Sequence, residues 1–98
     1  MFDINTINKR YFTIKIDDLT IEVEPPKLKA LKKITSLTKV RSEDTMDGLS
    51  EAVEMILSKN KAKIKISDEI VDELDLDQMN AILTAYFEWL SKEKNSPN

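Results

Sequence analysis

The sequence lacks cysteine and histidine and is nearly free of glycine. It contains no Cys and no His, and only one Gly and three Pro among 98 residues. Without cysteine the chain has no disulfide scaffold, no thiol nucleophile and no thiolate metal site. Without histidine it lacks the side chain most often used as a general base near neutral pH and as a transition-metal ligand. The composition therefore argues against an enzyme, and we expect no catalytic, cofactor-binding or metal-binding residues.

Long apolar runs are also missing. No stretch approaches the roughly 18 apolar residues that a membrane-spanning helix needs. Residues 1–5 show no basic segment leading into an apolar one, so we expect neither a membrane partner nor a secretion signal. Apolar residues make up 41% of the chain and charged residues 34%. That balance is typical of a single soluble domain, which we expect to span residues 1–98.

Basic and acidic residues alternate in blocks along the chain. Residues 27–41 hold six bases and no acid, whereas residues 42–58 hold five acids and no base. One interpretation is attraction between neighbouring elements, with each exposed pair worth about 0–1 kcal/mol. The other is that one block faces a partner of opposite charge. The net charge of −3 argues against nucleic acid as that partner.

Alternating apolar residues predict a β-hairpin over about residues 11–24. A two-residue turn at Asp17-Asp18 would place Ile16 opposite Leu19, so that the apolar rows of both strands share one face. Two adjacent aspartates suit a type I′ turn less well than Asn-Gly, because that turn needs a positive φ at both central residues. An additional strand within residues 2–7 is left open.

Helical periodicity after the hairpin predicts three to four helices, over about residues 26–40, 43–59, 68–74 and 76–92. Pro25-Pro26 would open the first helix, whose apolar stripe winds around it and predicts contact with more than one neighbour. Gly48 marks a close approach between helices or a local weakness, and Asn60 is a plausible residue just past the end of the second helix. The fold class is therefore α+β, mainly α.

The last predicted helix has capping signals at its start and a polar segment at its end. Asp75 and Gln78 stand three residues apart, which is the spacing of a capping box. The apolar residues of this helix cover an arc of about 160°, wider than the roughly 100° that one packing face needs. The helix is therefore either central or shared with something outside the chain. We expect the polar tail at 92–98 to be disordered.

Aromatic and basic side chains provide the candidate partner-binding residues. Trp89 and Tyr86 on the last helix have two interpretations, as core residues or as part of an apolar groove that accommodates a partner helix with the adaptable Met55. The wide apolar arc favours the groove. The lysines of the first helix could assist, which gives the set Trp89, Tyr86, Met55, Lys29, Lys32 and Lys33.

The acidic residues between Asp68 and Asp77 are the other candidate for chemistry. They could be taken for a cation site or an acid–base pair, but they lack the spacing and the glycine of a calcium loop. We interpret them as solvated helix starts that carry capping acids.

The order of the segments resembles the tail assembly chaperones of long-tailed phages and prophages. The resemblance covers about residues 11–91 and rests on loose patterns at Val23–Lys33, Leu49–Asn60, Asp72–Ile82 and Tyr86–Leu90. It implies a non-enzymatic protein of the bacterial host cytoplasm. Such a protein coats the tape measure protein until tail tube subunits polymerise around it, and it is absent from the mature virion. The resemblance transfers no binding residues.

Several alternatives remain beside this hypothesis. With the tape measure protein as the expected partner, contact with the tail tube protein and self-association are both open. A small regulatory or antitoxin-like interaction domain is a second function class, and an enzyme with paired carboxylates on a metal is a third.

Overall fold

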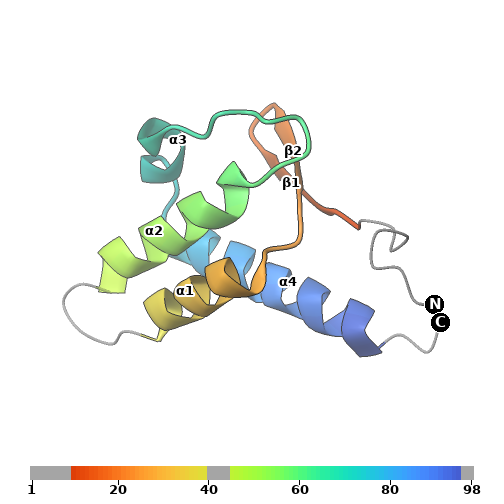
Figure 1. The fold of residues 1–98 in the computed structure, drawn as a ribbon. Coiled ribbons are helices and arrows are strands. Elements are labelled where there is room, and N and C mark those ends of the chain that lie inside the picture. The colour runs from red at the N-terminus through yellow and green to blue at the C-terminus, as the bar shows by residue number, and fades with distance from the viewer. Residues whose placement is uncertain (1–9, 40–44, 96–98) are drawn as a thin grey trace.

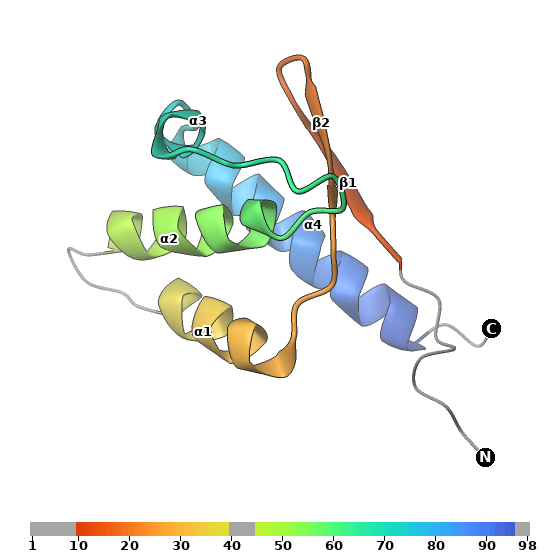
Figure 2. The same cartoon turned by 45° about the horizontal axis from the view of Figure 1, so that its top comes forward.

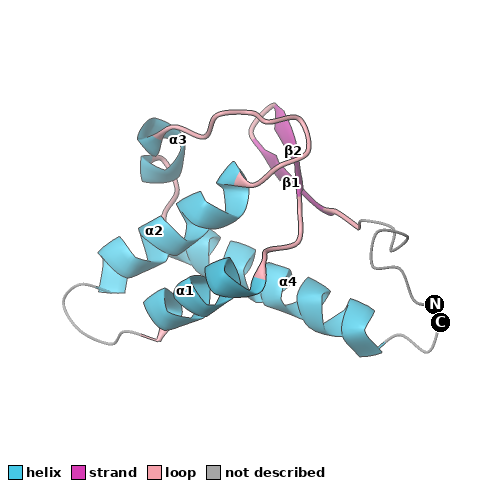
Figure 3. Cartoon of the chain, viewed as in Figure 1, coloured by secondary structure: helices cyan, strands magenta, loops and turns pink. Residues whose placement is uncertain are grey.

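In the part of the chain that the structure describes, a two-stranded hairpin is followed by four helices. The computed structural model describes residues 10–39 and 45–95. The elements are β1 (Phe12–Ile16), β2 (Leu19–Val23), α1 (Leu28–Thr38), α2 (Thr45–Ser58), α3 (Asp68–Asp72) and α4 (Leu76–Asn95). Figures 1 and 3 show the small hairpin beside a mainly helical body. The predicted α+β, mainly helical class is confirmed, whereas residues 2–7 lie outside the described part.

The hairpin has the predicted register. β1 and β2 are antiparallel and Ile16 pairs with Leu19, so the apolar rows lie on one face. In the turn Asp17 has a φ of 53°, while Asp18 has no positive φ, so the turn is not type I′. Aspartate tolerates this left-handed conformation better than most residues do, which explains how a turn without glycine closes the hairpin.

A third segment, which the sequence did not predict as a pairing partner, joins the hairpin on the outer side of β2. Val23 forms an isolated antiparallel bridge with Asn60. The Glu24 N–H donates to the Lys59 carbonyl at 2.9 Å, and the Lys61 N–H donates to the Glu22 carbonyl at 2.9 Å. This pairing is too short to leave an alternating pattern in the sequence. It fastens the end of α2 to β2.

The central element is α2, which packs against α1, α3, α4 and β2. Its apolar face is buried through Leu49, Ala52, Val53, Ile56 and Leu57. Figure 2 shows α1 and α4 on either side of it, with the hairpin crossing over α4. The wide apolar arc of α4 therefore does not make that helix central. It reflects two neighbours, α2 on one side and the hairpin on the other.

The first helix starts later than predicted, and its first apolar residue is exposed. Both prolines precede the N-cap residue Lys27, which is extended, and α1 begins at Leu28. Its main neighbour is α2, and the winding apolar stripe leaves the Leu28 side chain 67% exposed. At its start the stripe therefore presents an exposed apolar residue on a basic helix.

Two local predictions are confirmed in the helices. A Cβ on buried Gly48 would lie 2.9 Å from the Leu37 carbonyl oxygen, so this glycine marks the close approach of α1 and α2. The capping box also forms, because the Gln78 N–H donates to Asp75 Oδ1 at 2.7 Å and the Asp75 N–H donates to Gln78 Oε1 at 2.9 Å. The α4 backbone stays helical through Asn95, past the predicted end at Lys92.

Candidate docking groove

An aromatic cluster joins the start of the hairpin to the C-terminal half of α4. The Phe12 ring lies 5.8 Å from the Tyr86 ring and 5.7 Å from the Trp89 ring, measured between centroids. The Arg10 guanidinium lies 4.7 Å from the centroid of the Trp89 ring and donates a hydrogen bond of 3.1 Å to the Trp89 carbonyl. These contacts hold the hairpin against α4 and leave Trp89 half-buried.

Tyr86 and Trp89 therefore have different environments. Tyr86 is only 1% exposed and belongs to the core, which corrects its place in the partner-binding set, because a side chain so deeply buried cannot touch a partner in this conformation. Burial also raises the pKa of its phenol to about 12, since desolvation penalises the phenolate. Trp89 keeps part of its surface accessible and lines a hollow on the outer side of α4.

Two adjoining hollows run between the hairpin and α4. The larger, of about 870 Å³, lies between the hairpin tip, α3 and the first turns of α4, with an apolar lining of Ile14, Ile16, Leu19, Ile70, Leu74, Ala81 and Ile82. The second, of about 740 Å³, is lined by Phe12 and by α4 residues from Asp77 to Trp89. Ala81 lines both hollows. We call these two hollows together the hairpin groove.

The dimensions of the hairpin groove suit a peptide segment. Along α4 its lining extends from Asp77 to Trp89, which is about 18 Å at about 1.5 Å per residue. That length accommodates roughly three turns of a docked helix. The floor of the larger hollow is made of buried and half-buried isoleucines and leucines, so an apolar stripe of a partner could exclude water from it.

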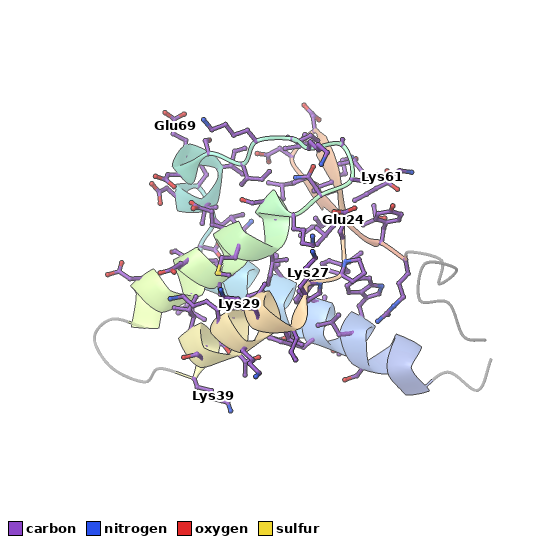
Figure 4. The ribbon with its side chains drawn as sticks, in the orientation of Figure 1. Glu24, Lys27, Lys29, Lys39, Lys61 and Glu69 are labelled. Atoms are coloured by element: carbon purple, nitrogen blue, oxygen red, sulfur yellow. The ribbon has the colours of Figure 1, made fainter. Side chains whose placement is uncertain are left out.

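The rim of the hairpin groove is strongly acidic. The two hollows are lined by six carboxylate side chains, Asp17, Asp18, Glu69, Glu73, Asp77 and Glu88, and by one ammonium group, that of Lys15. Figure 4 shows Glu69 on α3, on the side of the molecule opposite Lys29 of α1 and Lys39, the residue just after α1. The α3 side of the rim therefore lies away from the basic helix of the same chain.

The remaining candidate residues do not join Trp89 on one surface. Met55 is half-buried on α2, packs against the core and lines neither hollow of the hairpin groove. Lys33 forms an exposed ion pair of 3.8 Å with Glu51 on α2, as expected from attraction between neighbouring charge blocks. Lys32 lines a separate shallow hollow on α1 together with Leu28 and Leu31, and Lys29 is exposed on the same helix.

The acidic segment around α3 contains no metal-binding group. Among residues 10–39 and 45–95, no three acidic side chains are gathered so that they could hold an ion. Asp75 caps α4 as described above. A hydrogen bond to Asp68, together with the negative charge of that residue, raises the pKa of the Glu54 carboxyl.

The sequence missed the larger hollow of the hairpin groove because that hollow depends on how far the hairpin tip stands from α3. Ile14, Ile16 and Leu19 had the alternation of a buried face, yet the structure leaves them half-buried. The shortness of α3 was the sequence signal that could have indicated this hollow. Ile70 on α3 and Leu74 just after it lie opposite the hairpin tip, but the helix is too short to cover the tip.

Comparisons with known proteins found no relative of this chain. No helix in the described ranges is long and apolar enough to cross a membrane. The sequence matches no known protein family and no curated protein, and the fold matches no solved structure.

Proposed function

We propose that this protein is a non-enzymatic tail assembly chaperone that binds the tape measure protein of a long-tailed phage and keeps it soluble during tail morphogenesis. The observation that carries the proposal is the hairpin groove, an open apolar surface beside a half-buried tryptophan on a small acidic domain. A largely helical tape measure protein exposes apolar stripes before the tube encloses it, and a groove of this kind can cover such a stripe.

The open shape of the hairpin groove fits reversible binding. Its two hollows lie at the surface between the hairpin and α4, so a docked helix would keep one side in water. Modest affinity for each copy, multiplied over many copies along a long partner, would protect the partner and still allow tail tube subunits to displace the chaperone. We place this action in the cytoplasm of the bacterial host, before the virion is complete.

Co-expression with a tape measure protein tests the proposal. We expect the protein to raise the soluble fraction of its partner and to co-purify with it. Ala81→Arg should abolish both effects, because Ala81 is exposed on α4 and lines both hollows, so the long side chain would fill the groove. Ala62→Arg is the matched control, since Ala62 is equally classed as exposed and lies in the loop after α2, outside the groove.

The same experiment can contradict the proposal. If the tape measure protein stays insoluble beside the wild-type chain and does not co-purify, the proposed function is wrong. If Ala81→Arg protects the partner as well as the wild type does while remaining folded, the hairpin groove is not the contact surface.

A further inference from the structure

The charge around the hairpin groove carries information about its occupant. An apolar floor alone would accept any apolar stripe, but here the carboxylates of Asp17 and Asp18 stand on the hairpin side and those of Glu69 and Glu73 on the α3 side. Lys15 provides the one cation in the lining. An occupant with acidic flanks would bring like charges together on both sides, which is unfavourable.

The chain does not use these carboxylates for its own packing. The ion pairs within the described ranges, Lys33 with Glu51 and Lys59 with Glu24, involve none of the groove carboxylates. Figures 2 and 4 show the basic helix α1 on the opposite side of α2 from α3, and α3 residues line the larger hollow. The carboxylates on both sides of the larger hollow are exposed. They are therefore available to a partner.

We propose that the hairpin groove binds a basic amphipathic helix, whose apolar stripe lies on the isoleucine and leucine floor and whose flanking lysines or arginines reach the carboxylates on both sides. This inference rests on the proposed function and specifies the chemistry of the segment that is bound. Apolar contact supplies most of the affinity, because exposed ion pairs contribute little individually. The charges supply selectivity, faster association and salt dependence.

Synthetic peptides provide the test, and the single tryptophan provides the signal. Trp89 is the only Trp of the chain and lines the groove, so its emission should change when the groove is filled. Two helical peptides of about 18 residues, without tryptophan, carry the same leucine stripe and are flanked by lysine in one and by glutamate in the other. That length is enough for appreciable helicity.

We expect the lysine-flanked peptide to bind about tenfold or more tightly than the glutamate-flanked peptide at low salt. The preference should shrink as the ionic strength rises, because the charges are exposed and become screened. The double variant Glu69→Gln with Glu73→Gln should bind the lysine-flanked peptide about three- to tenfold more weakly. The variant Asp17→Asn with Asp18→Asn removes the same charge from the hairpin side and should weaken binding similarly.

The control variant Glu22→Gln with Asp47→Asn removes two carboxylates that are exposed but lie outside the groove. It should bind the lysine-flanked peptide like the wild type. Thermal unfolding of each variant shows whether it is folded. If one double variant fails to fold, the other still tests the inference from the opposite side.

The possible outcomes separate this inference from the proposed function. Equal binding of both peptides would overturn the charge preference and leave an apolar docking groove intact. Binding of neither peptide would overturn the inference and remove support from the proposed function as well. If light scattering shows that the protein alone forms oligomers that the Glu69→Gln, Glu73→Gln variant dissociates, the occupant is a second copy and the inference is wrong.

Discussion

The side-chain amide of Asn60 is buried where α2 ends and the chain turns toward β2. Its Nδ2 donates to the carbonyls of Leu57 and Ile64, each at 2.9 Å, and its Oδ1 accepts from the Ile64 N–H at 2.7 Å. With 4% of its surface exposed, Asn60 is a buried polar residue whose hydrogen bonds are satisfied within the protein. One amide thereby closes the turn that carries Ile64 back to the core.

Removing this amide should be costly. Asn60→Ala would leave the Ile64 N–H and two carbonyls without their partner in a place that water reaches poorly, so we expect a loss of about 2–4 kcal/mol in the free energy of unfolding. Urea unfolding followed by circular dichroism measures the change. Asn80→Ala on the exposed surface of α4 is the control and should change stability by less than about 0.5 kcal/mol. An Asn60→Ala protein as stable as the wild type would contradict the role given to the amide.

Tyr86 predicts how stability changes at alkaline pH. Its folded pKa is about 12 against an ordinary value of 10, because burial disfavours the phenolate. The unfolded chain therefore loses this proton at lower pH than the folded chain does. The contribution of the buried Tyr86 phenol to the free energy of unfolding is fully present below pH 10 and is lost as the pH rises toward 12. Tyr86→Phe should make the decline of the unfolding free energy between these pH values shallower. Tyr11→Phe, which removes the other phenol, is the control and should leave the decline as it is in the wild type. Parallel pH profiles for wild type and Tyr86→Phe would refute this.

At the scale of elements, the contact between α1 and α2 depends on the missing side chain of Gly48. An added Cβ would meet the Leu37 carbonyl oxygen at 2.9 Å, and a backbone atom cannot move aside as a flexible side chain can. Glycine inside a helix normally costs about 1 kcal/mol relative to alanine. Here the close approach of the two helices explains why that cost is accepted.

Gly48→Ala should therefore destabilise the protein although alanine favours helix. We expect a loss of about 1–2 kcal/mol, because the steric cost of overpacking exceeds the gain in helix propensity. Thermal unfolding tests this. Ser58→Ala, at the exposed end of α2, is the control, because it raises helix propensity without a steric clash. A raised melting temperature for Gly48→Ala would show that α1 and α2 can move apart without penalty.

At the scale of the whole molecule, the hairpin and α4 bring distant parts of the chain together. Phe12 near the start of the described chain contacts Trp89 near its end, with ring centroids 5.7 Å apart. The same contact forms one end of the hairpin groove, since Phe12 and Trp89 both line the second hollow. Stability and the shape of the groove are therefore coupled at this point.

Phe12→Ala should loosen the hairpin from α4. We expect a loss of about 2–4 kcal/mol in unfolding free energy and a red shift of the Trp89 emission, because the indole gains contact with water. Thr13→Ala, on the outer face of the same strand, should leave the emission unchanged. If Phe12→Ala left both the stability and the emission of the wild type intact, the aromatic cluster would not be what holds the hairpin.

Local patterns determined much of the fold. The strand register followed from alternation and turn length, the start of α4 followed from the Asp75–Gln78 spacing, and the close approach at Gly48 was visible as a lone glycine within a helix. Each of these depends on residues near one another in sequence, so their chemistry suffices to fix them.

The tertiary structure alone decided which apolar residues are hidden. Tyr86 and Trp89 share the apolar side of one helix and both contact the Phe12 ring, yet Tyr86 is enclosed in the core and Trp89 is half-buried. In the same way, a short α3 leaves the hairpin tip uncovered and creates the groove. Burial depends on the packing of segments far apart in the chain, and no periodicity within a single segment contains that information.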